Sequence, residues 1–492
     1  MYSGRGFRDW EIGDIDVVRD RNLYHLFHLI IPNHDYIAHA VSSDGITWRR
    51  VKNALFVGEP GSWDDDMLWT MNIAKRNGKW HMFYTGLSRR DSGRIQRIGL
   101  ALSDDLYSWE KIDRAPYPLE CGPPWYEGAD HNPRTWISFR DPYYFSHQGT
   151  EYLTFCGRTR EGAIFRRGCA GLLKLGAKAA ELMPPLHWPR VYDDVECPCI
   201  FQLGKSWFLV GSIREDVQVR YWVSSDPFGP YQAPSENVLF PKGNYATRVA
   251  YDQETLLLYS FFILGHDVSG TRVLPPPKQV AVNAEGRLYL QSFYRWNLLV
   301  QNTLKLQDMG TPRAVLANPS AEALWSESSA SAGPSGLSFR ASSKSGYEFF
   351  LWEAPSSHIR WRLDLTVLRF GKLGLIVNSD REGQGYFIVL DMLHGFAQIR
   401  SWSENIADVF QDYTFENLQA NNFPLDKPLS IELIAYGNYL ELSIASRIVL
   451  SLMNYSHDGR YFGIFSSSAE VHIANSTIET LREPGDEYSG EI

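Results

Sequence analysis

The chain repeats the stretch Ala40-Val41-Ser42-Ser43-Asp44-Gly45-Ile46-Thr47-Trp48, and this repetition reveals how it is built. A second copy is Ala101-Leu102-Ser103-Asp104-Asp105-Leu106-Tyr107-Ser108-Trp109, and a shorter one is Trp222-Val223-Ser224-Ser225-Asp226. Each copy runs from an apolar stretch into an Asp, a residue whose carboxylate accepts hydrogen bonds from its own backbone in turns. The pattern therefore predicts a strand that ends in a polar turn, once in each of several repeated units.

A second element recurs between these copies. It consists of a short polar turn followed by an apolar or alternating strand, and its five copies are residues 23–29, 79–85, 151–157, 206–212 and 255–261. Repeats of roughly 50 to 70 residues that hold several short strands are typical of propeller blades. Five copies predict a five-bladed β-propeller over residues 1–305.

The remaining residues follow a different pattern. A run rich in Ser, Ala and Gly, Ser326-Glu-Ser-Ser-Ala-Ser-Ala-Gly-Pro-Ser335, is typical of a linker, which we place at 306–340. Strands then return at a spacing of roughly 8 to 12 residues, which predicts a β-sandwich over 341–485. Only 177–183 and 404–408 suggest short helices. The expected fold class is all-β, a five-bladed β-propeller followed by a C-terminal β-sandwich.

The composition limits the classes of partner. Of the 492 residues, 44% are apolar and 21% are charged, a balance that excludes wholesale disorder. The formal net charge of −9 leaves no electrostatic footprint for nucleic acid and little attraction to anionic lipid. No apolar run approaches the ~20 residues that span a bilayer. We therefore expect neither nucleic-acid nor membrane partners, and the oligomeric state stays open.

The N-terminal residues and the cysteines indicate the compartment. The first residues lead directly into charged ones and lack the apolar core of a signal peptide. The five cysteines include no CxxC pair, which argues against both a disulfide framework and a zinc site. We expect a cytoplasmic protein with no cofactor and no metal.

Three carboxylates recur near one position of the repeat. Asp141 and Glu196 each lie eleven residues before the aromatic residue that anchors the next repeated strand, and Asp14 lies ten residues before its own. Equivalent positions on the innermost strands of a propeller face its axis at a similar height. We therefore expect the three carboxylates to converge in one funnel.

Convergent like charges raise the pKa of at least one of the carboxyl groups. A neutral carboxylic acid beside an ionised carboxylate is the pair that hydrolyses glycosides, because one donates a proton to the leaving oxygen while the other attacks or activates water. A single acid at a strand end is more often a turn acceptor. Three at one register favour the catalytic interpretation.

The motifs around these residues resemble those of glycoside hydrolase family 32, the invertase, inulinase and levanase group. Arg140-Asp141-Pro142 is similar to the RDP motif of that family, and Glu196-Cys197-Pro198 is similar to its EC motif. Two further stretches match in the same order, namely His39 through Trp48 and Asp64-Asp65-Asp66-Met67-Leu68-Trp69. The resemblance covers about residues 7–300, and the family also carries a trailing β-sandwich.

The resemblance implies a role for each carboxylate. Asp14 would be the nucleophile, Asp141 the transition-state stabiliser and Glu196 the general acid/base. The first motif departs from the family pattern W-M-N-D-P-N-G, because the chain has Trp10-Glu11-Ile12-Gly13-Asp14-Ile15-Asp16. Asp16 is therefore a competing nucleophile, or a group that binds a sugar hydroxyl. At this motif the chain is closer to the related arabinan-cleaving family 43.

Five other residues are candidates for binding the sugar. Arg140 could hydrogen-bond sugar hydroxyls and keep the neighbouring carboxylates ionised, or it could simply pair with an acidic turn. Trp69 lies at the axial position of the second blade, where its ring could support a sugar or pack in the core. Asn72 follows three residues later, and Asn33 and His34 lie in the loop where the family contacts sugar.

We therefore expect a glycoside hydrolase that acts on a small-molecule carbohydrate and cleaves terminal furanosides. The expected substrates are β-fructofuranosides such as sucrose or fructo-oligosaccharides, cleaved by a retaining double displacement. One alternative is an inverting hydrolase similar to arabinofuranosidases and arabinanases, in which the two carboxyl groups lie ~6.5–9.5 Å apart rather than ~5–5.5 Å. Another is a sugar-binding propeller without catalytic activity.

Overall fold

The computed structural model describes residues 2–3, 11–129, 134–176, 178–240, 243–263, 272–317, 319–327, 337–391, 396–402, 411–414, 427–453 and 457–483. The chain divides into two units, Met1–Leu290 with Gly485–Ile492, and Gln291–Pro484. The described helices are four short 3₁₀ helices: η1 (Arg89–Asp91), η2 (Ile164–Arg166), η3 (Tyr294–Leu299) and η4 (Leu306–Met309). None of them has the length and hydropathy of a membrane span.

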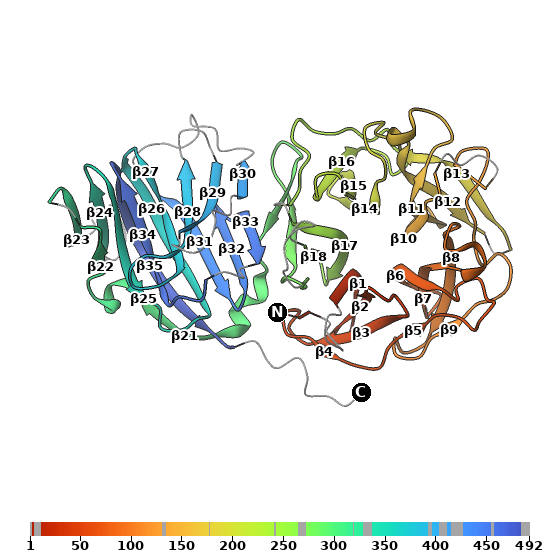
Figure 1. Ribbon diagram of the computed structural model, residues 1–492, viewed down its shortest axis with the longest axis horizontal. Coiled ribbons are helices and arrows are strands. Elements are labelled where there is room, and N and C mark those ends of the chain that lie inside the picture. Colours follow the sequence, from red (N-terminus) through yellow and green to blue (C-terminus); the bar gives the residue numbers. More distant parts are fainter. Residues whose placement is uncertain are drawn as a thin grey trace. The chain divides into compact units, whose positions relative to one another are not determined.

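The first unit contains five antiparallel sheets, each made of strands that follow one another in the chain (Figure 1). The first sheet contains β1 (Glu11–Asp20), β2 (Leu23–Ile31), β3 (Tyr36–Ser42), β4 (Arg49–Arg50) and β5 (Leu55–Phe56). The second contains β6 (Met67–Arg76), β7 (Lys79–Leu87), β8 (Arg97–Ser103) and β9 (Glu110–Lys111). The third contains β10 (Phe139–His147), β11 (Thr150–Arg158), β12 (Gly168–Leu175) and β13 (Ala180–His187).

The fourth sheet contains β14 (Glu196–Leu203), β15 (Ser206–Ile213) and β16 (Gln218–Ser224), and the fifth contains β17 (Asn244–Asp252), β18 (Thr255–Phe262), β19 (Lys278–Val282) and β20 (Leu288–Gln291). The sheets surround a common axis (Figure 1). The innermost strands β1, β6, β10, β14 and β17 contact one another in this cyclic order, and β17 contacts β1 to close the ring. The predicted five-bladed propeller is confirmed.

Each blade begins with a hairpin of the same construction. A two-residue turn joins the innermost strand to the second strand, and the first turn residue has a φ between 49° and 62° in every blade. Turns of this kind match the right-handed twist of the strands that they connect. Because all five turns contain two residues, positions in different blades can be compared by counting back from the turn.

Each innermost strand also carries a β-bulge at the same height. The register shifts lie between Ile12 and Ile15, Trp69 and Met71, Arg140 and Tyr143, Glu196 and Cys199, and Tyr245 and Arg248. A bulge interrupts the alternation of side chains along a strand and re-aims the residues within it. Consecutive residues such as Arg140 and Asp141 can therefore both reach the interior of the propeller.

Apolar clusters fill the spaces between neighbouring blades. Phe27 and Leu29 of the first blade pack with Leu68, Met71 and Met82 of the second, and all five are almost fully buried. Burial of a large apolar side chain contributes about 1.5–3 kcal/mol. Similar clusters join the second blade to the third and the third to the fourth.

The first and fifth blades are joined by polar contacts as well. The buried Asp252, at the end of β17, accepts a hydrogen bond from the Tyr24 hydroxyl and pairs with Arg19. The guanidinium of Arg19 also lies 5.4 Å from the centre of the Tyr24 ring. These contacts hold the ring closed between the first and fifth blades, which are neighbours in space but are not consecutive in the chain.

The repeated Asp turns have the expected geometry. Asp44 Oδ1 accepts from the amides of Ile46 and Thr47 at 2.8 and 2.7 Å. Asp105 makes the same pair of bonds to the second and third residues after it, and Asp226 bonds the amide of Phe228. The repeated stretches therefore end in turns that the Asp carboxylate stabilises.

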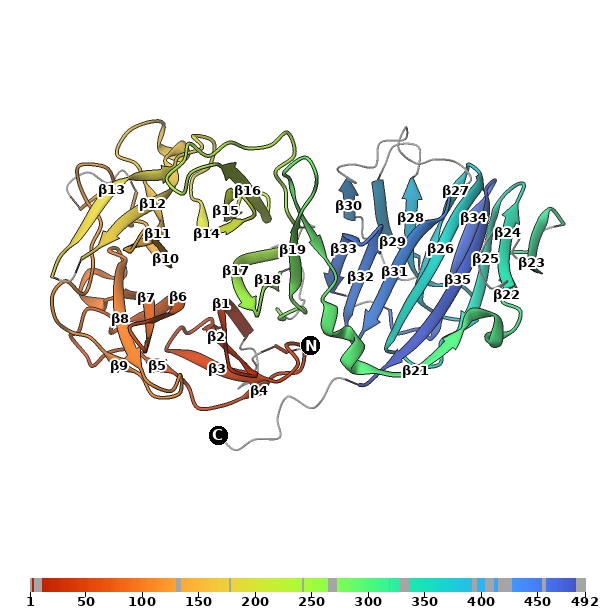
Figure 2. The same cartoon turned by 180° about the vertical axis from the view of Figure 1, so that it is seen from behind.

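The second unit contains two antiparallel sheets (Figure 2). One contains β21 (Val300–Lys305), β23 (Ala321–Glu327), β24 (Leu337–Ser343), β26 (Ile359–Arg369), β31 (Leu429–Tyr436), β32 (Tyr439–Ile444), β33 (Arg447–Met453) and β35 (Glu470–Leu481). The other contains β22 (Arg313–Val315), β25 (Tyr347–Glu353), β27 (Lys372–Ser379), β28 (Gly385–Asp391), β29 (Phe396–Trp402), β30 (Gln411–Thr414) and β34 (Tyr461–Ser467). Aromatic pairs join the sheets, including Phe339 with Trp352 at 4.9 Å and Trp361 with Phe462 at 5.0 Å between ring centres. This is the predicted β-sandwich.

The boundary between the units differs from the expected one. It falls after Leu290 rather than after residue 305, because β21 pairs with β35 of the sandwich. The segment 306–340 is not only a linker, since β22 pairs with β25 and β23 pairs with β24. Ser and Ala have low strand propensity, so pairing with a neighbouring strand, and not local sequence, creates these edge strands.

One of the two expected helices is a strand. Residues 180–187 form β13, which pairs with β12 at the edge of the third blade. The tertiary pairing overrides the weak helical preference of this segment. The other expected helix, 404–408, lies outside the described residues.

Candidate active site

The three predicted carboxylates lie at the bulges of β1, β10 and β14. Counted back from the hairpin turn, Asp14 and Asp141 occupy the same position, together with Thr70, Cys197 and Ala246. Glu196 lies one residue earlier, at the position of Arg140. The expectation that all three carboxylates share one register is therefore wrong for Glu196.

The error has a simple cause. The hairpin turns of the third and fourth blades end at Thr150 and Ser206, so the counterpart of Tyr152 is Phe208 rather than Trp207. Aromatic residues mark the strand but do not define its register. Glu196 still reaches the site, because the bulge allows residues at two consecutive positions to do so.

Asp14 is partly exposed and is held through one carboxylate oxygen. Its Oδ2 accepts a hydrogen bond from the hydroxyl of the buried Thr70, and the Cys197 sulfur lies 3.8 Å from the same oxygen. Burial raises the pKa of Asp14, and the charge of Glu196 raises it further. The Thr70 bond and the positive charge of Arg248 act in the opposite direction.

Asp141 is buried, and backbone amides set its orientation. Its own N–H donates to Thr85 Oγ1 at 3.2 Å, and its Oδ2 accepts from the Cys197 N–H at 2.9 Å. Its φ of 59° is unusual for a residue other than glycine and is a source of local strain. Burial raises the pKa of Asp141 and so does the nearby Asp14, whereas Arg140 and the Cys197 amide lower it.

The bond between Asp141 and the Cys197 amide arises because the third blade has a different residue at the position that accepts this amide in other blades. In the fifth blade the corresponding amide, that of Ala246, donates to Ser212 Oγ of the blade before it at 3.0 Å. Thr85 is the counterpart of Ser212 in the second blade, and Asp141 N–H donates to it. The third blade has Cys156 at this position. A thiol is a weak acceptor, so the Cys197 amide bonds the Asp141 carboxylate instead.

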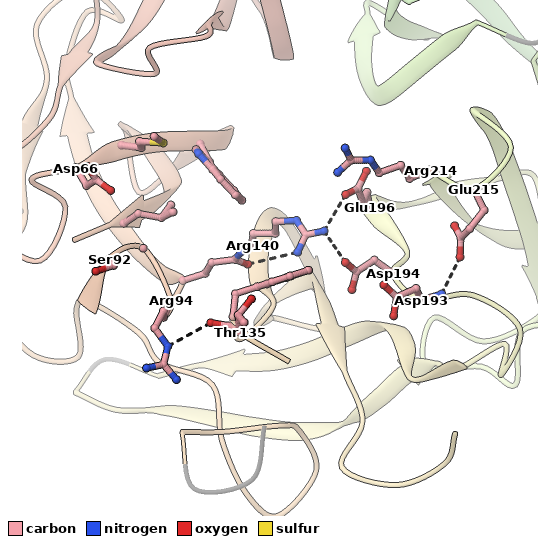
Figure 3. Close-up of a pocket in the computed structure, with 16 residues that line it drawn as sticks. Asp66, Ser92, Arg94, Thr135, Arg140, Asp193, Asp194, Glu196, Arg214 and Glu215 are labelled. Carbon is pink, nitrogen blue, oxygen red and sulfur yellow. Dashed lines mark hydrogen bonds and ion pairs between the residues drawn. The ribbon is translucent and has the colours of Figure 1, made fainter. Parts of the chain in front are cut away.

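Glu196 accepts hydrogen bonds at both carboxylate oxygens. Arg140 Nη2 donates to Oε1 at 2.8 Å, and the Tyr245 hydroxyl donates to Oε2. The same Arg140 nitrogen donates to Asp194 Oδ2 at 2.9 Å, and Arg140 Nε lies 3.7 Å from Asp141 Oδ2. Arg140 thus lies among three carboxylates, two of which it contacts in Figure 3.

Glu196, Arg140 and Trp69 line a pocket with a volume of about 740 Å³ (Figure 3). Pockets for small ligands usually measure about 300–1,000 Å³. Trp69 also packs against the apolar cluster of the first two blades, so it both lines the pocket and contributes to the core. Asp14 and Asp141 are not among the lining residues. Oxygen atoms of these two residues and the Cys197 sulfur lie within 4.8 Å of one another.

Burial raises the pKa of the Cys197 thiol well above its usual value, and a protonated thiol is a poor ligand for a metal ion. The cluster of Asp14, Asp141 and Cys197 is therefore better suited to hold a proton or a substrate than a metal ion. Charge at this point is balanced instead by the arginines around it.

Asp16 and Asn72 lie away from the pocket and hold each other. Both are buried, and Asp16 Oδ2 accepts from Asn72 Nδ2 at 3.1 Å and from the Ile73 amide at 2.5 Å. Asn72 Oδ1 accepts from the Tyr144 amide at 2.8 Å, so this pair joins three blades. Burial raises the pKa of Asp16 to about 7. Asp16 and Asn72 therefore form a structural pair that connects neighbouring blades.

The structure does not bring Asn33 to the site. Its side chain is exposed and does not line the pocket. His34 is partly buried, its ring lies 6.1 Å from that of Trp69, and its carbonyl accepts from the Leu68 amide at 2.9 Å. Its contribution is to position Trp69 and the start of β6.

Sequence reasoning missed four residues at the site. They are Thr70, Tyr245, Asp194 and Arg248. Thr70 and Tyr245 lie on innermost strands at or next to the register of Asp14, so counting from the hairpin turns would have found them. Asp194 lies in the loop before β14, and no repeat position marks it. Arg248 lies on β17 at the register position of Asp16, two residues nearer the hairpin turn than Asp14, and no repeated motif marks it.

Comparison with known proteins supports a relation to glycoside hydrolases. Residues 10–250 match the family described as glycosyl hydrolases family 43. No curated protein matches the chain. The sequence match covers the first four blades and most of β17, including all three carboxylates.

Solved structures match almost the whole chain. The sucrose-6-phosphate hydrolase from Lactobacillus gasseri has a TM-score of 0.70 and 16% identity, over 96% of this chain and 91% of that one. A variant of fructan 1-exohydrolase IIa from Cichorium intybus in complex with 1-kestose has a TM-score of 0.70 and 13% identity, over 96% and 95%. The fructofuranosidase from Schwanniomyces occidentalis complexed with fructose has a TM-score of 0.66 and 14% identity, over 96% and 96%. At such low identities this likeness establishes the shared propeller–sandwich fold.

Proposed function

We propose that the protein is a retaining glycoside hydrolase that cleaves terminal furanosides, with β-fructofuranosides as its substrates. One observation carries this proposal. Asp14 and Asp141 lie side by side at one register of the propeller, and Glu196 lies one position away at the wall of an open pocket. Paired carboxyl groups in distinct environments are the machinery of glycoside hydrolysis.

Asp14 is the proposed nucleophile. Its carboxylate is partly exposed, and the Thr70 hydroxyl fixes one oxygen while the other remains available to attack the anomeric carbon. Asp141 is more enclosed, and its amide contact fixes it as a carboxylate beside the reacting sugar. There it would stabilise positive charge on the ring in the transition state and bind sugar hydroxyls.

Glu196 is the proposed general acid and base. Arg140 can only donate hydrogen bonds, so it cannot share Oε1 with a proton, whereas the Tyr245 hydroxyl can either donate or accept. The catalytic proton therefore belongs on Oε2, where Tyr245 would reverse its hydrogen bond. From there the proton would pass to the leaving oxygen and return from the attacking water.

The charge of the pocket favours a neutral sugar. Its lining contains five acidic side chains, Asp66, Asp193, Asp194, Glu196 and Glu215, and three arginines. This balance disfavours a phosphorylated substrate. Trp69 offers an aromatic face to an uncharged ring. The complexes of similar folds with 1-kestose and with fructose support a fructosyl group in this pocket.

The family match favours a second candidate. Because residues 10–250 match family 43, and the first motif resembles the arabinan-cleaving enzymes, the alternative is an inverting arabinofuranosidase-like hydrolase. Inversion requires a wider separation of the two carboxyl groups, so that water fits between the acid and the base.

One experiment distinguishes these functions. The purified protein is incubated with sucrose, 1-kestose and an aryl α-L-arabinofuranoside, and NMR spectroscopy records the first anomer released. Release of β-fructose from 1-kestose supports the proposal, and inverted arabinose supports the alternative. Asp14→Asn and Glu196→Gln should abolish turnover, while Asp104→Asn, an exposed acid in the second blade, should not. Sugar binding without any turnover would refute both enzymatic proposals.

The cytoplasmic location remains a prediction. All five cysteines are free thiols, and four of them are buried, which suits a reducing compartment. Fractionation of the native host would test it.

A further inference from the structure

Arg248 is a buried cation that the proposed reaction has not used. It lies on β17 with an exposed fraction of 1%. Counted from the hairpin turn, it occupies the position of Asp16, two residues nearer the turn than the level of Asp14 and Asp141. Arg248 therefore belongs to the layer next to the carboxylates, on the side of the hairpins.

The contacts of Arg248 are unusual for a buried arginine. Its Nη2 donates to Pro142 O and its Nη1 to Thr247 O, both at 3.4 Å, and within the described chain its Nε has no partner. The guanidinium carbon lies 5.8 Å from the centre of the Tyr143 ring. None of the described carboxylates forms an ion pair with it. Arg140 and Arg158, which are buried to a similar degree, each contact carboxylates directly.

An isolated charge in a protein interior is strongly unfavourable unless opposite charge lies nearby. The groups that interact with Arg248 lie on three strands: Asp14 and Asp16 on β1, Asp141 and Tyr143 on β10, and Cys197 and Cys199 on β14. Tyr143 and the two cysteines are neutral, because burial raises the pKa of each of them. Burial raises the pKa of Asp16 to about 7, so Asp16 keeps its proton below that pH, and the carboxylates of Asp14 and Asp141 carry the negative charge that balances Arg248.

We propose that Arg248 is a positioning residue of the carboxylate site. It supplies the buried positive charge that balances Asp14 and Asp141, and it anchors the Asp141 bulge through Pro142 O. This inference rests on the proposed function for its effect on catalysis, but not for its effect on the carboxylates themselves.

The two parts of the inference act on different properties. A fixed positive charge favours the ionised form of a neighbouring carboxyl group and lowers its pKa by about one to three units at close range. Removing the charge should therefore raise the pH at which Asp14 becomes ionised. The bond to Pro142 O opposes relaxation of the strained backbone at Asp141, so losing it should reduce kcat at every pH.

Three variants separate the two parts. Arg248→Met removes both charge and bond, Arg248→Gln removes the charge but keeps an N–H donor, and Arg248→Lys keeps the charge. Arg360→Met is the matched control, because Arg360 is a buried arginine of the sandwich that pairs with Glu479. Near-ultraviolet circular dichroism identifies which variants fold, and Arg248→Gln replaces Arg248→Met if the latter does not.

The first measurement is the acid limb of the kcat/KM profile against pH. We expect the midpoint of this limb to move to higher pH by about one unit or more in Arg248→Met and Arg248→Gln. In Arg248→Lys and Arg360→Met the midpoint should stay within roughly a few tenths of a pH unit of wild type. An unchanged limb in both charge-removing variants overturns the inference. An equal shift in Arg248→Lys also overturns it, because the charge would then not be the cause.

The second measurement needs no activity. Infrared titration of the substrate-free protein, taken as the difference between each background and its Asp14→Asn partner, follows the ionisation of Asp14 together with the shift that Asp14 causes in Asp141. The midpoint should be higher with Arg248→Gln than with the natural arginine, and equal midpoints would overturn the inference. If no furanoside is hydrolysed, the proposed function fails while this titration still decides the role of Arg248.

Discussion

The hydrogen bond from Thr70 to Asp14 offers a direct test of how the nucleophile is held. Thr70 is buried on β6, and its hydroxyl donates to Asp14 Oδ2. Thr70→Val has nearly the same shape but no donor. The substitution therefore removes one favourable contact with the ionised carboxylate and leaves the rest of the first two blades unchanged.

The size of the effect follows from the kind of bond. A hydrogen bond to a charged acceptor contributes about 1.5–3 kcal/mol, and one pKa unit corresponds to about 1.4 kcal/mol. Burial already raises the pKa of Asp14, and the Thr70 bond opposes that rise. Thr70→Val should therefore raise the pKa of Asp14 by about one to two units.

The assay is the profile of kcat/KM against pH for the best furanoside. Its acid limb, which reports ionisation of the nucleophile in the free enzyme, should move to higher pH by the same one to two units, roughly. Thr154→Val is the control, since Thr154 is equally buried on β11 but its hydroxyl has no partner among the described residues. The reasoning is refuted if the limb does not move, or if Thr154→Val moves it equally.

Three further outcomes are expected. The folded-state pKa of Asp16 is raised to about 7, so the folded protein holds a proton that the unfolded chain releases, and stability falls as pH rises from about 4 to 7. Asp16→Asn should flatten this dependence by up to about 4 kcal/mol in urea unfolding at pH 4.5 and pH 8, and an unchanged slope would contradict the assignment. Asp14→Ala should lose the chemical step and regain part of it with azide or formate, whereas Asp16→Ala should mainly lower the free energy of unfolding, because it removes the contacts with Asn72 and the Ile73 amide; rescue confined to Asp16→Ala would reverse the two roles. Cys156→Ser places a hydroxyl where it can capture the Cys197 amide, so kcat should fall at least severalfold as Asp141 loses that contact, with KM measured in parallel. Activity equal to wild type would show that the amide bond does not matter.

Local patterns in the sequence were sufficient for the architecture. Each blade repeats the same apolar strand, and in the first, second and fourth blades a turn follows whose Asp bonds its own backbone. Such signals are local, because turn chemistry and side-chain alternation depend on residues a few positions apart. They also place Asp14, Asp141 and Glu196 on innermost strands. The edges of the domains were less predictable, because β21 and β23 exist only through pairing with distant strands.

The alignment of the carboxylates was decided by tertiary structure. Neighbouring side chains on a strand point to opposite faces, so an error of one residue in register would normally place Glu196 on the wrong face. The bulges remove this alternation at the site, and a bulge depends on pairing with the next strand, which the residues of β14 do not reveal by themselves.

The sequence by itself therefore determined the number of blades, the sandwich and the strands that carry the acids, because these follow from short repeated patterns. Only the tertiary structure decided which groups those acids touch. Thr70 comes from the second blade, Tyr245 and Arg248 come from the fifth, and all three meet the carboxylates because the ring closes. Contacts between blades depend on the closure of the whole propeller, and no short stretch of sequence contains that information.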